Sequence, residues 1–169
     1  MPRLAQWLMA TKTWISTILG DRVSWRLEKL MDTLDITPLR NAVAALEASL
    51  LVVKGKDAAT TPEAEMNTLR SGVIQNFEVA YELCWKFMQR WLEVFKGDSA
   101  VDFWGKKDLF RHAFEAGLIP DSVPWFEFHR SRNKTSHTYN EDTAEDVFEA
   151  AKTFPAHARA FLTELERRL

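Results

Sequence analysis

The stretch that decides the fold is residues 61–97, TPEAEMNTLRSGVIQNFEVAYELCWKFMQRWLEVFKG. Thr61 and Pro62 are typical of a helix start, because proline fits the first helical turn, where its missing N–H has no partner. Gly97 is typical of a helix end. Between them, apolar residues recur at steps of three and four: Met66, Leu69, Val73, Phe77, Ala80, Cys84, Phe87, Trp91 and Phe95. A second apolar line widens this face: Ile74, Tyr81, Trp85 and Met88. We predict one long helix, at the centre of a bundle or at a dimer surface.

The flanking sequence predicts further helices. Thr37 and Pro38 predict a helix start with Thr37 as its cap, and Gly55 predicts a left-handed end to that helix. A short helix is expected over about 106–117, and the next helix runs into the polar stretch 130–141. A last helix begins near Asn140, and Pro155 should kink it or divide it in two. These patterns predict an all-α, up-and-down bundle of four or five helices.

The composition limits the class of protein. A chain of 169 residues with 46% apolar and 27% charged residues suits one globular domain. Only 6 Gly and 6 Pro disfavour an all-β fold. The net charge of -2 means that any contact with RNA must come from a local patch. The single Cys84 is expected in the core of a cytoplasmic protein, and no apolar run approaches the ~20 residues that a membrane span needs.

Residues 1–30 differ from the rest of the chain. Up to Gly20 they contain no acidic residue, and their apolar residues have roughly helical spacing. A secretory signal or a transit segment fits poorly, because polar residues interrupt the apolar stretch and Arg is scarce. An interfacial helix would have a thin cationic face. We therefore expect residues 1–30 to be an appendage or the result of a mis-chosen start, and residues 31–169 to form the bundle.

The polar stretch RSRNKTSHTYNE, residues 130–141, holds the candidate chemistry. Arg132 and His137 would point about 140° apart on a continuous helix. They share a site only if the helix ends between them or if a second subunit completes the site. The acidic start of the next helix supports a break there, and its free N–H groups would bind an anion such as phosphate.

The residue types suggest roles around a phosphate. Arg132 suits phosphate oxygens, and His137 suits acid–base catalysis near neutral pH. Residues that bind or orient the phosphate are Asn133, Lys134, Thr135 and Ser136, with positive potential from Lys134, Arg130 and His129.

Two other interpretations of this stretch remain open. In a structural one, Arg132 pairs with Glu141 or Glu145 while His137 and Tyr139 fill a helix junction. In a second, His137 and Glu141 would share a metal, but no further His–carboxylate cluster stands out, so we expect neither a metal nor a cofactor.

Three sequence blocks resemble HEPN domains. Arg132 and His137 match the Arg-x4-His signature, and residues 132–141 look like the branch of nucleotidyltransferase substrate-binding proteins. Residues 74–86 and 114–119 resemble the same branch. The resemblance covers about residues 32–168 and leaves the first 30 residues without a counterpart.

The resemblance implies a helical homodimer with a cognate minimal nucleotidyltransferase. It implies metal-independent RNA cleavage at the dimer interface, in which the 2′-hydroxyl of the RNA attacks the adjacent phosphate, His137 serves as base or acid and Arg132 stabilises charge. Such a chain would be the toxin of a toxin–antitoxin pair, and the partner would silence it by adenylylating Tyr139. A non-catalytic subunit that binds a nucleotide substrate for the nucleotidyltransferase is the alternative, and a plain interaction module is a third.

Overall fold

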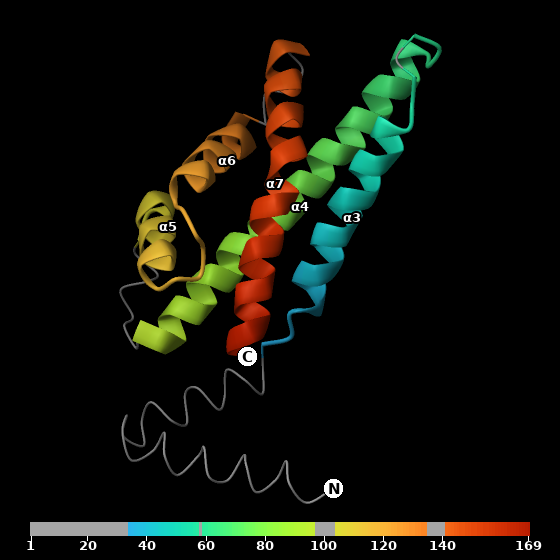
Figure 1. The fold of residues 1–169 in the computed structure, drawn as a ribbon. Helices are drawn as coiled ribbons and strands as arrows, with labels where there is room; N and C mark the ends of the chain where they lie inside the picture. Colours follow the sequence, from blue (N-terminus) through green and yellow to red (C-terminus); the bar gives the residue numbers. More distant parts are fainter. Residues whose placement is uncertain (1–33, 58, 97–103, 135–140) are drawn as a thin grey trace, which may run out of the picture.

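The bundle consists of helices throughout the part of the chain that the computed structural model describes, which is residues 34–57, 59–96, 104–134 and 141–169. Within these ranges the helices are α3 (Thr37–Lys54), α4 (Glu63–Lys96), α5 (Lys106–Glu115), α6 (Val123–Lys134) and α7 (Glu141–Arg168). The long helices α3, α4 and α7 lie side by side, and the short helices α5 and α6 pack at one flank (Figure 1). The predicted all-α bundle is confirmed.

Ion pairs between helices show how the long helices are oriented. Arg40 near the start of α3 binds Glu166 near the end of α7, with Nη2 and Oε1 2.7 Å apart, so these two helices are antiparallel. Arg70 and Glu145, 2.9 Å apart, join the N-terminal parts of α4 and α7, so these two are parallel. Exposed pairs of this kind add about 0–1 kcal/mol each, so packing holds the helices together.

The helix α4 is the centre of the bundle, one of the two predicted positions, and contacts each of the other four described helices. Both predicted apolar lines are largely buried. The buried members are Val73, Ile74, Phe77, Ala80, Tyr81, Cys84, Phe87, Met88 and Trp91. Cys84 is the expected core residue, and burial raises the pKa of its thiol. Among the described helices, none is both long and apolar enough to cross a membrane.

A cluster of aromatic rings joins α4, α6 and α7. The Phe154 ring packs edge-to-face against Phe77, Trp125 and Phe128, at centroid distances of 5.2, 5.6 and 5.0 Å. Phe154 and Trp125 are fully buried. Each such pair contributes about 0.5–1.5 kcal/mol beyond its buried area, so this cluster fixes the position of α6 on the two long helices.

Two predicted helix ends of α3 are wrong in detail. Thr37 is the first residue of α3 and not its cap, because the upstream carboxylate of Asp35 accepts the N–H of Thr37 at 2.9 Å. Gly55 has φ -78° and is not left-handed. Its N–H continues the helical pattern to the carbonyl of Leu51, and the chain turns instead at Asp57, whose side chain accepts the N–H of Ala59.

Pro155 does not divide the last helix. The structure has one continuous α7 with Pro155 inside it, so the predicted division is wrong. A proline removes one helical hydrogen bond. Buried residues on both sides of it, Phe154 and Ala158, pack into the same core.

The end of α5 has the left-handed glycine that the end of α3 lacks. Gly117 has φ 70°, and the N–H of Leu118 reaches back to the carbonyl of Ala113 at 2.8 Å. The guanidinium of Arg168 donates to the carbonyls of Ala116 and Gly117 at 2.8 and 2.9 Å. The last turn of α7 therefore stabilises the end of α5.

Substituting Gly117 and Gly72 by alanine should change stability in opposite directions. A Cβ at Gly117 would lie 3.1 Å from Nη2 of Arg168 at a positive φ, so Gly117→Ala should lower the free energy of unfolding by about 1–2 kcal/mol. Gly72 lies inside α4 with open space around it, so Gly72→Ala should raise it by about 1 kcal/mol. Urea denaturation measures both, and a Gly117→Ala protein as stable as wild type would contradict the role of this turn.

Candidate functional site

The predicted motif begins in the last turn of α6. Arg132 is half-buried there, Asn133 is exposed, and Lys134 is the last residue of the helix. The other predicted site residues lie outside the described residues: Thr135, Ser136, His137 and Tyr139. The structure thus places the first half of the motif, and the second half stays a prediction.

An ion pair joins the end of α6 to α7. Nζ of Lys134 lies 2.8 Å from Oδ2 of Asp146 on α7. Twelve residues of continuous helix would separate them by about 18 Å, so α6 and α7 fold back against each other. Lys134 therefore ties the two helices together at the place where the motif lies.

One of the two acidic residues that were predicted to pair with Arg132 is bound to another arginine. Glu145, one of its two predicted partners, binds Arg70 of α4 at 2.9 Å. The side chain of Glu141, the other one, lies outside the described residues. Arg130, expected to raise the positive potential, pairs with Glu127 one turn earlier at 3.0 Å, which reduces its net effect.

Arg132 lies beside a hydrogen-bonded pair that the sequence analysis did not identify. The buried Tyr81 of α4 has its hydroxyl 2.8 Å from Nδ1 of His129 on α6, and the two rings are stacked. The amide nitrogen of Asn133 lies 3.3 Å from Nε2 of the same imidazole. With Asn133 donating to Nε2, Nδ1 carries the proton and donates it to the Tyr81 oxygen. His129 thus connects the core to the last turn of α6.

His129 is neutral at neutral pH, so the prediction that it adds positive charge is wrong. Burial lowers the pKa of His129, and the charges of Lys106, Arg132 and Lys107 lower it further. Burial and the nearby charge of Glu82 raise the pKa of Tyr81, while Arg132 opposes that rise. The helical spacing of His129 and Arg132, three residues apart, was the available signal that they share a face.

A cavity lies elsewhere on the bundle. It has a volume of about 480 Å³ and is formed by the start of α3 and the second half of α4. Its lining residues are Asp35, Pro38, Leu83, Lys86, Phe87, Gln89, Arg90 and Glu93. It does not include Arg132. In the described ranges, no three His, Cys, Asp or Glu residues are grouped so that they could hold a metal ion.

The neutral state of His129 predicts a pH dependence of stability. Its pKa in the folded protein lies below the value of about 6.5 in the unfolded chain, so between the two values the unfolded state binds more protons. The free energy of unfolding should therefore decrease as the pH falls from 7 through this window, and His129→Gln should flatten that decrease. Tyr81→Phe is the matched control for losing one hydrogen bond alone. An NMR titration midpoint of His129 at or above 6.5 would contradict the assignment.

Comparisons with known proteins fit this architecture. Residues 34–167 match the family described as nucleotidyltransferase substrate binding protein like. The Haemophilus influenzae protein named Probable ribonuclease HepT is 32% identical over 142 residues, which cover 82% of this chain and 97% of that protein.

Two solved structures resemble the fold. One from Haemophilus influenzae, described as the fold of a substrate binding domain of a nucleotidyltransferase, is 30% identical with a TM-score of 0.73. The match covers 78% of this chain and 99% of the Haemophilus influenzae chain. A Thermus thermophilus protein is 28% identical with a TM-score of 0.57, and it covers 77% of this chain and 98% of its own. The chain therefore belongs to the HEPN-related family of nucleotidyltransferase substrate-binding proteins.

Proposed function

We propose that this protein is a metal-independent endoribonuclease, the toxin of a pair whose second member is a minimal nucleotidyltransferase. His137 takes the proton of an RNA 2′-hydroxyl, whose oxygen attacks the adjacent phosphorus. The bond from phosphorus to the 5′-oxygen breaks, and that oxygen receives a proton. The products are a 2′,3′-cyclic phosphate and a 5′-hydroxyl. Arg132 stabilises the negative charge on the phosphate oxygens in the transition state.

The observation that carries this proposal is the surroundings of Arg132. It sits half-buried in the last turn of α6, whose end is joined to α7 by the Lys134–Asp146 ion pair, and it acts together with Lys106 and Lys107 on the pKa of His129. A corner with several cations, one of them a guanidinium, suits a phosphodiester. The name of the Haemophilus influenzae relative supports the same chemistry.

The catalytic roles are tested by expression without the partner and by cleavage of RNA in vitro. Wild type should arrest growth, whereas Arg132→Ala and His137→Ala should not, with cleavage reduced at least about 100-fold. Arg167→Ala is the matched control, because Arg167 also lies in the last turn of a helix and pairs with a carboxylate three residues earlier. Cleavage should persist in EDTA and fail on RNA with a 2′-deoxy residue at the cut position. Equal arrest by wild type and His137→Ala would refute the proposal.

We also propose that two copies of the chain form each site, as the resemblance to HEPN domains implies; the end of α6 at Lys134 leaves a site within one chain as the alternative. If each site takes its Arg and its His from different subunits, mixing Arg132→Ala and His137→Ala proteins should restore activity. Random dimers would regain about a quarter of wild-type activity, since half of them are mixed and each mixed dimer has one intact site of two. Light scattering measures the dimer. No restored activity in confirmed mixed dimers would show that the site lies within one chain.

A non-catalytic role is the second candidate, favoured by the family description and by the similar Haemophilus influenzae structure. In that case the protein presents a nucleotide or RNA substrate to the nucleotidyltransferase. Nucleotide transfer that depends on Arg132, without RNA cleavage by this chain, would select this function. In the toxin proposal, the partner instead adenylylates Tyr139, and Tyr139→Phe should remain toxic when the partner is present.

Two further expectations belong to the same proposal. Residues 1–30 are an appendage to the bundle of residues 31–169, which is supported by a family match that begins at residue 34. The protein acts in the cytoplasm, where its RNA substrate and its partner would meet. A chain starting at Met31 should fold and retain the activity of the full chain if the appendage has no part in it.

A further inference from the structure

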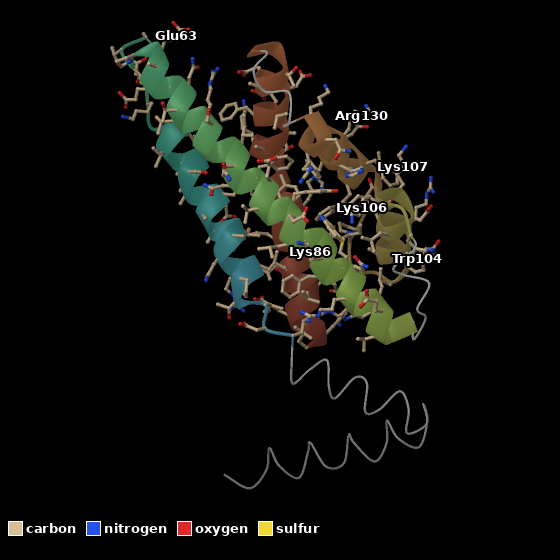
Figure 2. All side chains as sticks on the ribbon, turned by 180° about the vertical axis from the view of Figure 1, so that it is seen from behind. Glu63, Lys86, Trp104, Lys106, Lys107 and Arg130 are labelled. Carbon is tan, nitrogen blue, oxygen red and sulfur yellow. The ribbon has the colours of Figure 1, made fainter. Side chains whose placement is uncertain are left out.

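Cations from two helices act on His129. Lys106 and Lys107 begin α5, and Arg132 lies in the last turn of α6, while Lys86 on α4 acts on Lys106. Figure 2 shows Lys86, Lys106 and Lys107 on one face of the bundle. After burial, the charges of Lys106, Arg132 and Lys107 are what lower the pKa of His129, so these three cations lie within electrostatic range of a single imidazole.

Lys106 is held in place by an aromatic ring. Its Nζ lies 2.8 Å from the centroid of the Trp85 ring on α4. The indole N–H of Trp85 donates to Oε2 of Glu82 at 2.9 Å, and Lys86 binds the other oxygen of Glu82 at 3.2 Å. The side chains of Trp85 and Glu82 thus fix each other, and the ring presents one face to the ammonium of Lys106.

Among the described residues, Lys86 is paired with Glu82, whereas Lys106 and Lys107 have no ion pair. Within the described ranges, no carboxylate lies within ion-pair distance of Lys106 or Lys107, and Glu82 is the one acid that acts on the pKa of Lys106. Burial lowers that pKa, Glu82 raises it and Lys86 lowers it. Lys106, Lys107 and Arg132 bring like charges together with Glu82 as the nearby acid, and a bound anion would lower the repulsion that remains between them.

The first turn of α5 adds positive potential. Gly105, the residue before Lys106, provides no side-chain cap for the free N–H groups of this turn. The partial positive charge of this helix N-terminus adds to the charges of Lys106 and Lys107. The side chain of Asp108 in the same turn is bound to Arg111 at 2.8 Å. The start of α5 and the end of α6 therefore present two adjacent cationic positions.

We propose that Lys106, held on Trp85, binds a second phosphate of the same RNA strand, next to the phosphate that Arg132 holds. This inference rests on the proposed function and extends it. The substrate is then a single strand with at least two consecutive phosphates bound, one at the end of α6 and one at the start of α5. The neutral Tyr81–His129 pair lies beneath them and adds no charge of its own. A substrate with one phosphate uses the Arg132 position alone.

The alternative is that Lys106 only fastens α5 to α4 through Trp85. That role predicts a loss of stability on substitution and no change in the salt dependence of RNA binding. Lys106→Gln removes the charge that lies over the Trp85 ring and leaves a shorter polar side chain, whereas Lys106→Arg keeps the charge and the length. Lys54→Gln is the matched control, because Lys54 is an exposed lysine at the end of α3.

The test is binding of a 2′-O-methyl oligoribonucleotide, which cannot be cut because its nucleophile is blocked. In the full-length protein, Lys106→Gln should weaken binding about tenfold and reduce the slope of log affinity against log salt by about 0.7. Lys106→Arg and Lys54→Gln should behave like wild type. A dinucleotide with a single phosphate should bind wild type and Lys106→Gln equally.

The outcomes separate this inference from the proposed function. Wild-type binding without cleavage of ordinary RNA would refute the ribonuclease, while the second phosphate position would still be judged by the salt slope. An unchanged slope in Lys106→Gln, or an equal loss for the dinucleotide and the longer strand, would overturn the inference. If Lys106→Arg fails to match wild type, Lys106 has a packing role alone. If the wild-type protein does not bind the oligonucleotide, the inference is also overturned.

Discussion

The packing of Phe154 against Phe77, Trp125 and Phe128 is the constraint on which the candidate site depends. These rings join α4, α6 and α7, so they determine how far along α4 the short helix α6 lies. Arg132 follows Phe128 by about one turn, and its position is therefore set by a buried aromatic contact. A loss of this contact would move the guanidinium without any change to the motif itself.

The same packing also desolvates two polar residues near Arg132, Tyr81 and His129. Because Tyr81 and His129 are desolvated together, the imidazole stays neutral and satisfies the tyrosine hydroxyl at little electrostatic cost. The positive potential of the corner then comes from groups whose charge is fixed near neutral pH, Lys106 and Arg132. Such a corner attracts a phosphate without depending on the protonation of His129.

The two candidate functions need the same corner. A ribonuclease and a substrate-binding subunit both have to hold a phosphate next to Arg132, and they differ in what His137 does to it. Membership in the family is consistent with either, since its description refers to substrate binding and the Haemophilus influenzae relative is named a probable ribonuclease. The distinction therefore lies in chemistry at one imidazole and not in the fold.

The sequence by itself determined the helical bundle, the long apolar face of α4 and the place of Arg132 near a helix junction. These follow from periodicity and from local helix signals, which depend on neighbours three and four residues away. Only the tertiary structure decided that Gly55 is right-handed, that α7 continues through Pro155, and that Arg168 caps α5. It also decided that His129 is neutral and that Lys106 lies near Arg132. Each of these depends on burial or on contacts between residues distant in sequence, and a pattern read along one chain carries no information about either.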